Sequence, residues 1–92
     1  MNIFQSVKKS VTARQAAERY GLKVNTNGMA CCPFHQDRHP SMKVDQGFYC
    51  FACGAKGDVI TFTGKLFGMS PYEAAKKLIT DFNLPIPLKE QK

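Results

Sequence analysis

The stretch that decides the fold is Cys32-Pro33-Phe34-His35, followed after a spacer of fourteen residues by Cys50-Phe51-Ala52-Cys53. In each half, two residues separate a pair of zinc-binding side chains, and this gap lets both donor atoms reach one ion from a tight turn. We call these halves the first and the second knuckle. Together they supply three thiolates and one imidazole in a tetrahedral shell. Because such a shell leaves no position for water or substrate, we expect one structural Zn²⁺ and no catalytic metal.

A disulfide framework is the competing interpretation, since the chain has four cysteines, an even number. The first ten residues contain two lysines and no long apolar run, so they do not indicate a secretory signal. No segment reaches the roughly 18 apolar residues that a membrane-spanning helix needs. We therefore expect a cytoplasmic protein with no membrane partner, in which thiols stay reduced and paired knuckles bind metal.

Cys31 and His39 are conceivable rival ligands near the first knuckle. Neighbouring residues on an extended segment point to opposite sides, so only one of Cys31 and Cys32 can face the metal. We assign Cys32, which makes the tighter knuckle, and expect Cys31 to be a small buried apolar residue. Pro40 disfavours the helix that would bring His39 onto the face of His35, so His39 is expected at the surface or in a turn.

The chain has 92 residues and a formal net charge of +6. This length fits a single domain over residues 1–92, whose hydrophobic core alone is marginal. Residues 30–57 have few large apolar side chains and many turn formers, so metal binding is expected to stabilise them. The first 29 residues carry five basic side chains against one acidic. This balance favours a polyanionic partner such as nucleic acid, although ordinary solubility charge is an alternative that charge alone does not exclude.

Local patterns predict three helices around an extended, metal-bound centre. The helices are expected over residues 12–20, 58–67 and 70–83, and each begins at a residue that can cap it, namely Thr12, Asp58 and Ser70. The central region spans residues 24–57. Within it, residues 41–44 and 48–51 have the composition of two strands, which would form a hairpin closed by the ion.

Two stretches, Cys32 to Val44 and Phe48 to Phe62, resemble the zinc-binding domain of bacterial DNA primases, of the Cys-His-Cys-Cys type. The similarity includes the ligand spacing, the Pro-Ser after the first knuckle, the glycines after the second and the Asp-Val-Ile that follows. The helices on either side are similar in position only. The chain departs from the family pattern at His39, Tyr49 and Ala52, and none of these departures removes a ligand.

The resemblance implies an α+β fold, in which a small zinc ribbon is flanked by helices. The ribbon would be an antiparallel sheet with one structural zinc at its edge. The zinc ligands would be Cys32, His35, Cys50 and Cys53. In primases this domain helps to recognise single-stranded template, so the resemblance implies a nucleic-acid-binding face that includes Arg38, Lys43, Phe48, Tyr49 and Lys56.

The expected function is therefore binding of nucleic acid, preferably single-stranded DNA, in DNA replication or primer synthesis. The chain contains no two aspartates one residue apart, so the acidic magnesium cluster of nucleotidyl transfer is not expected. The residues after Asn83 are too few for the catalytic module of primases, so we do not expect one in this sequence. We expect no enzymatic activity from the chain alone, and a separate primase, polymerase or helicase chain as its partner.

The sequence allows either base stacking or a packing role for the aromatic residues of the second strand. Phe48 shares a side of its strand with Cys50, so it either stacks on bases or covers the metal. Tyr49 and Phe51 share the other side, and Tyr49 is the better candidate for stacking.

Two other functions compete with single-strand binding. One is a zinc-stabilised adaptor that presents a surface to a replication enzyme. The other is a helix-turn-helix binder of duplex DNA, suggested by the residues from Thr12 to Gly21, although no recognition helix is predicted to follow them.

Overall fold

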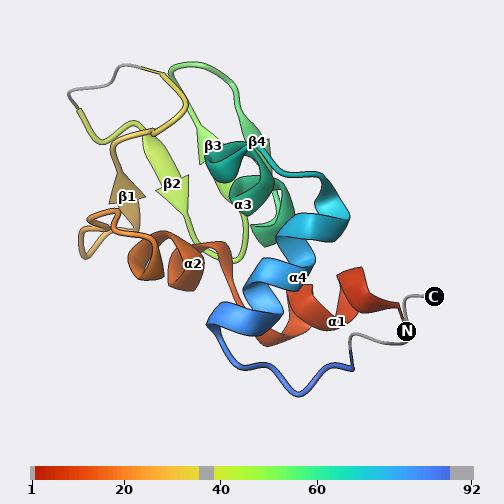
Figure 1. Ribbon diagram of the computed structural model, residues 1–92. Helices are drawn as coiled ribbons and strands as arrows, with labels where there is room; N and C mark the ends of the chain where they lie inside the picture. The colour runs from red at the N-terminus through yellow and green to blue at the C-terminus, as the bar shows by residue number, and fades with distance from the viewer. Residues whose placement is uncertain (1, 36–38, 88–92) are drawn as a thin grey trace.

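The computed structural model describes residues 2–35 and 39–87, and its elements are arranged as Figure 1 shows. The helices are α1 (Ile3–Ser10), α2 (Ala13–Arg19), α3 (Val59–Phe67) and α4 (Pro71–Asp81). The strands are β1 (Met29–Ala30), β2 (Met42–Val44), β3 (Phe48–Cys50) and β4 (Lys56–Gly57). Because the helices and strands occupy separate stretches of the chain, the predicted α+β class is confirmed.

Three helices begin at the capping residues that the sequence indicates. In α2, Gln15 N donates to Thr12 Oγ1 at 3.1 Å and Thr12 N donates to Gln15 Oε1 at 2.8 Å. The same reciprocal pair joins Ser70 and Glu73 at the start of α4, at 3.0 and 3.2 Å. Asp58 caps α3 through its carboxylate. These bonds satisfy amides that have no partner inside the helix, and so they set where each helix starts.

Helix α1 differs from the sequence-based expectation, which had no helix before residue 12. Its cap is Asn2, whose side chain accepts a hydrogen bond from Gln5 N at 2.9 Å. Ile3 and Val7 lie one turn apart and are buried. A helix of eight residues is marginal in isolation, so α1 depends on its packing against α3 and α4.

The sheet is antiparallel throughout, with the strand order β1-β2-β3-β4. Its side chains alternate: Met42, Val44, Phe48 and Cys50 are buried, whereas Lys43 and Tyr49 between them are exposed. One face of the sheet therefore packs into the protein and the other faces solvent. Strands β1 and β4, which the sequence did not indicate, have two residues each and extend the predicted hairpin on both sides.

The turn between β2 and β3 connects the sheet to the helices. The first two amides of α2, Ala13 N and Arg14 N, donate to the carbonyls of Gln46 and Asp45 at 3.0 Å each. The turn also approaches β4 closely, because a Cβ added at Gly47 would lie 2.5 Å from the carbonyl oxygen of Gly57. Only glycine fits at residue 47 without a shift of this backbone.

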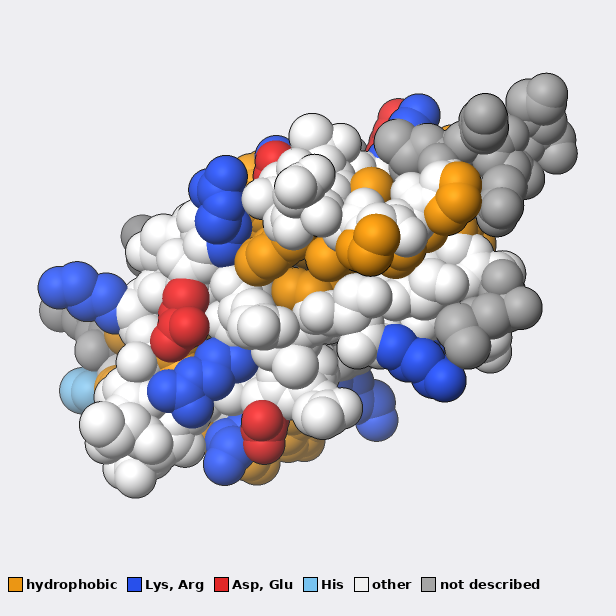
Figure 2. Space-filling view, turned by 90° about the horizontal axis from the view of Figure 1, so that it is seen from below, with side chains coloured by type: hydrophobic (Ala, Val, Ile, Leu, Met, Phe, Trp, Pro, Cys, Tyr) orange, Lys and Arg blue, Asp and Glu red, His pale blue; other side chains and the backbone are white. Residues whose placement is uncertain are grey.

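The core extends from the sheet through the helices. Its largest fully buried side chains come from both regions: Phe62, Met42, Leu78, Val7, Val44, Val59, Thr63 and Cys50. The face seen from below in Figure 1 carries a stripe of hydrophobic side chains (Figure 2). In α1 and the segment after α4, Phe4, Leu84 and Ile86 are partly buried against the core. Among the described residues, no helix combines the length and hydrophobicity that crossing a bilayer requires.

Candidate metal centre

The two knuckles lie next to each other because each follows a strand of the same sheet. Cys32 follows β1 by two residues, and Cys50 is the last residue of β3. The second knuckle turns tightly, since Gly54 N donates to Cys50 O and Cys50 N donates to Ala55 O, both at 2.8 Å. The antiparallel pairing of β1 with β2 and of β2 with β3 carries the two turns to one end of the sheet.

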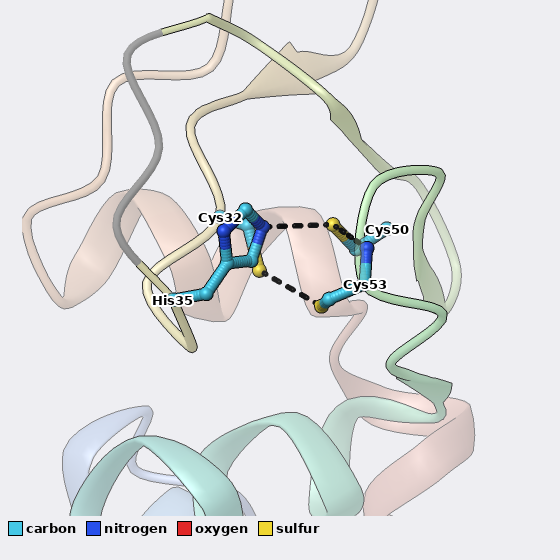
Figure 3. A group of neighbouring side chains, drawn as sticks. All are labelled: Cys32, His35, Cys50 and Cys53. Atoms are coloured by element: carbon cyan, nitrogen blue, oxygen red, sulfur yellow. Dashed lines mark hydrogen bonds between the residues drawn. The ribbon is translucent and has the colours of Figure 1, made fainter.

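The four predicted ligands converge on one point. Their donor atoms, three Sγ atoms and a ring nitrogen, all lie within 4.8 Å of one another. Figure 3 shows the His35 ring facing Cys50, with 3.4 Å between Nε2 and Sγ, and Cys32 facing Cys53, with 3.9 Å between the two sulfurs. Zinc bond lengths of about 2.3 Å to sulfur and 2.0–2.1 Å to nitrogen give tetrahedral edges of about 3.6–3.8 Å. The donor set therefore fits zinc in its chemistry, and these two pairs, at 3.4 and 3.9 Å, lie near these edges, while the whole group spans up to 4.8 Å.

Cys50 is the cysteine of this cluster whose pKa is lowered. Its side chain is fully buried, which raises its pKa, but hydrogen bonds outweigh burial and lower that pKa to about 6. The donors are the backbone N–H of Cys53 at 3.4 Å, the His35 ring and the Ser41 hydroxyl, with a further backbone N–H from Ala52. A sulfur with several donors is prepared to carry negative charge, as a metal ligand must.

Cys32 has the opposite tendency. Its side chain is 3% exposed, and burial is the main cause that raises its pKa to about 12. The neighbouring thiols of Cys50 and Cys53 raise this pKa further, whereas a hydrogen bond from the backbone N–H of Phe34 lowers it. Three thiolates packed this closely repel one another, so the cluster favours a bound cation that neutralises them.

The structure corrects the prediction for Cys31, which is exposed and not buried. The cause is the alternation that excluded it as a ligand: Cys32 points inward from an extended segment, so its neighbour points outward. His39 is exposed and lies outside the four-residue cluster, as expected.

The family model of the CHC2 zinc finger matches residues 2–92. The chain belongs to the CHC2 zinc-finger family. The resemblance seen in the sequence is thus confirmed, and the antiparallel sheet with the Cys-His-Cys-Cys cluster at its end is the expected zinc-ribbon-like arrangement.

Relatives of this CHC2 zinc finger include several DNA primases. The DNA primase of Rickettsia felis is 39% identical over 90 residues, which are 95% of this chain and 14% of that primase. The DNA primase of Rickettsia bellii is 38% identical over 95 residues, which cover all of this chain and 14% of that primase. The DNA primase of Helicobacter pylori strain J99 is 48% identical over 67 residues, which are 70% of this chain and 12% of that primase. The chain therefore spans about a seventh of the length of the first two primases, so the similarity concerns only that part of each primase.

The solvent face of this CHC2 zinc finger carries three of the predicted nucleic-acid contacts in one row. Tyr49 lies opposite Lys43 on one neighbouring strand and opposite Lys56 on the other. Directly paired residues of antiparallel strands project from the same face, and all three side chains are exposed. The fourth, Arg38, lies outside the described residues.

Phe48 is the fifth predicted contact, and the structure corrects it. Its side chain is 5% exposed, and its ring packs against Phe34 and Phe62 at centroid distances of 5.6 and 5.5 Å. A base could reach this ring only if the core opened. Phe48 therefore lies on the inner face of the sheet, where its burial argues against a direct contact with a base.

Phe51 is a surface residue that the sequence analysis did not select. It is 65% exposed, more than Tyr49 at 41%, and the two rings meet edge to face with their centroids 4.8 Å apart. The signal was present in the alternation, because residues two apart on an extended segment share a face. Which face of the strand is covered depends on the tertiary fold, which the sequence does not show.

The helix-turn-helix alternative, with residues 12–21 as its first helix, is contradicted. A recognition helix must follow the first helix within a few residues. After α2, the described part of the chain has no helix before α3 begins at Val59.

Proposed function

We propose that Cys32, His35, Cys50 and Cys53 hold one zinc ion, whose role is structural. The ion would cross-link the two knuckles, and four protein ligands would leave it no open position for chemistry. The support is the convergence of three thiols and one imidazole within 4.8 Å of one another, with two pairs, at 3.4 and 3.9 Å, near the edges of a zinc-centred tetrahedron.

We further propose that this zinc finger binds nucleic acid, preferably single-stranded DNA, through the solvent face of its sheet. One observation carries the proposal: an exposed tyrosine stands between two exposed lysines in a single cross-strand row, Lys43–Tyr49–Lys56. An aromatic ring stacks on a base of any sequence, and ammonium groups on either side attract the phosphates. Phe51 adds a second exposed ring beside the first.

Single strands fit this face better than duplex. Bases in a duplex are stacked on each other and present only their edges to a protein, whereas an exposed ring needs the open face of an unstacked base. The face is formed by strands of two or three residues, and the described residues provide no helix on it to enter a major groove.

The primase relatives support a place in replication. We propose that the zinc finger acts in primer synthesis as an accessory module, in the cytoplasm, with a primase, polymerase or helicase chain supplying catalysis. Arg38 remains a proposed contact, from its position in the sequence only.

The test is a titration of zinc-loaded protein with labelled single-stranded DNA, duplex DNA and RNA of one sequence, at several salt concentrations. The expected result is the tightest binding to single-stranded DNA, with log K falling by about 0.7 per phosphate contacted for each unit of log salt. Tighter binding to duplex or to RNA would contradict the proposed preference. No binding to any of the three at low salt would indicate the adaptor function, in which Tyr49 and Phe51 contact a protein.

Tyr49→Ala locates the site. We expect it to weaken single-strand binding about 5- to 150-fold, since one stacked base contributes about 1–3 kcal/mol. The matched control is Tyr72→Ala, which removes a similarly exposed tyrosine from α4, with 36% against 41% exposure, and should leave the affinity unchanged. Equal effects of both substitutions would show that the sheet face is not the site.

A further inference from the structure

Three aromatic rings from distant parts of the chain form one cluster, which includes a residue of the first knuckle. Phe34 belongs to the first knuckle, Phe48 to β3 and Phe62 to α3. The ring centroids are 5.6 Å apart for Phe34 and Phe48, 5.8 Å for Phe34 and Phe62, and 5.5 Å for Phe48 and Phe62. All three pairs meet in tilted or edge-to-face orientations, which aromatic rings favour.

The two knuckles are held to the rest of the protein in different ways. The second knuckle continues β3, and backbone hydrogen bonds between Cys50, Gly54 and Ala55 fix its turn. The first knuckle begins after β1 has ended at Ala30. The Phe34 ring joins it to α3 through Phe62 and through Lys65, whose Nζ lies 5.6 Å from the ring centroid.

Phe34 is also connected directly to the ligands on either side of it. It lies between Cys32 and His35 in the sequence, and its backbone N–H donates a hydrogen bond to the sulfur of Cys32. A displacement of Phe34 would therefore move one ligand through this hydrogen bond and the other through the adjoining peptide bond. Phe62, by contrast, is fully buried and remains in place as a fixed surface against which Phe34 rests.

We propose that Phe34 is the positioning residue of the metal centre: its ring packs against Phe48 and Phe62 and holds the first knuckle in register with the second. Without this ring the four ligands are still present, but Cys32 and His35 are free to move away from Cys50 and Cys53. Partners outside the ligand shell that orient ligands commonly change metal affinity by about 10- to 100-fold. The inference rests on the proposed zinc site.

The experiment compares zinc-loaded wild-type protein with Phe34→Ala, Phe34→Leu and the control Leu78→Ala. Leu78 lies in α4 and is fully buried. Its truncation should weaken the core while the rings of Phe34, Phe48 and Phe62 all remain present. The first measurement is the rate of zinc transfer to a chromogenic chelator. We expect Phe34→Ala to release zinc about tenfold faster than Leu78→Ala, and Phe34→Leu to restore most of the wild-type rate.

The second measurement shows which knuckle opens. Iodoacetamide is applied to the folded, zinc-loaded proteins, and mass spectrometry follows each cysteine. Cys31 is exposed and serves as the internal reference for reagent reactivity. Cys32 and Cys50 are both buried, so their ratio compares the knuckles. In Phe34→Ala we expect Cys32 to react before Cys50, whereas in Leu78→Ala both should stay protected or, if the protein opens, react together.

Equal release rates in Phe34→Ala and Leu78→Ala, or simultaneous alkylation of Cys32 and Cys50 in Phe34→Ala, would overturn the proposal. Where Phe34→Ala does not fold, Phe34→Leu is compared with Leu78→Ala by the same two criteria. Zinc content of the wild-type protein is measured first. Absence of tightly bound zinc there overturns the metal site itself, whereas bound zinc with unaltered release in the Phe34 variants overturns only the role of Phe34.

Discussion

The sheet region and the helical region of this small protein are built on different principles. Between residues 29 and 57, the strands have two or three residues each, and two of the buried hydrophobic side chains, Cys32 and Cys50, belong to the metal cluster. Helices α3 and α4 instead bury a wide set of apolar side chains: Val59, Ile60, Phe62, Ala74, Ala75, Leu78 and Ile79. Both regions share one core, but under the proposed metal site the first region also depends on cross-linking by the ion, so different perturbations should affect them.

Removal of the metal should have the largest effect. Structural zinc contributes on the order of 10–16 kcal/mol in small zinc domains, far more than strands of two or three residues can supply. We expect a strong chelator, or Cys50→Ser, to unfold residues 29–57 while most of the helical circular dichroism signal remains. Two-dimensional NMR of the amides would assign the loss to the sheet.

Cys31→Ser is the matched control, because Cys31 is exposed and outside the cluster. It should leave zinc binding and the spectrum unchanged. Loss of the helices together with the sheet after chelation would remove the distinction between the two regions and indicate one cooperative unit.

Leu78→Ala should have an intermediate effect, confined to the region that depends on packing. Leu78 is fully buried in α4, so its truncation leaves a cavity and should lower the free energy of unfolding by about 2–5 kcal/mol. Urea denaturation would measure this loss, and zinc stoichiometry should stay at the wild-type value. The control Thr80→Ala, at an exposed position of the same helix, should change stability by less than about 0.5 kcal/mol. Zinc loss in folded Leu78→Ala would contradict the separation.

The smallest expected effect concerns the contact between α2 and α4. Tyr20 donates a hydrogen bond to Asp81 at 2.7 Å, and Lys77 lies 3.1 Å from the same carboxylate. Burial, followed by this hydrogen bond and the charge of Asp81, raises the pKa of Tyr20 above its usual range. Tyr20→Phe should cost about 1 kcal/mol at pH 7, the typical value of one hydrogen bond.

The pH dependence gives this prediction its sign. A raised pKa in the folded state means that the contribution of Tyr20 is complete below about pH 10, the usual tyrosine pKa, and is lost as the pH rises toward the folded value. Ultraviolet titration of wild-type protein should therefore show a tyrosine that ionises late, and Tyr20→Phe should lack that phase. An unchanged titration curve would show that the hydrogen bond is weaker than its geometry suggests.

Much of the local structure could be predicted because its causes are local. The capping pairs of Thr12 with Gln15 and of Ser70 with Glu73 are three residues apart, so the sequence alone indicates where α2 and α4 begin. The residues of the metal cluster could also be predicted from the sequence, since a two-residue gap determines which donor atoms can share an ion.

The features that the sequence did not reveal depend on contacts between distant residues. Helix α1 forms because α3 and α4 cover it. The burial of Phe48 requires Phe62 from another element, and the exposure of Phe51 requires that no element covers it. Tyr20 and Asp81 are 61 residues apart in the chain, and no local pattern relates them. Alternation along a strand limits such residues to two faces, but only the tertiary fold decides which face is covered.

The strand order β1-β2-β3-β4 has a kinetic consequence, because every strand pairs with its immediate predecessor in the sequence. Such contacts close only short loops, so little chain entropy opposes them and the sheet can assemble rapidly. During synthesis, residues 29–57 can pair in order as they leave the ribosome, and metal capture has to wait only for Cys53. Helix α1, made first, must wait until α4 has emerged, so the N-terminal end of this chain completes its folding last.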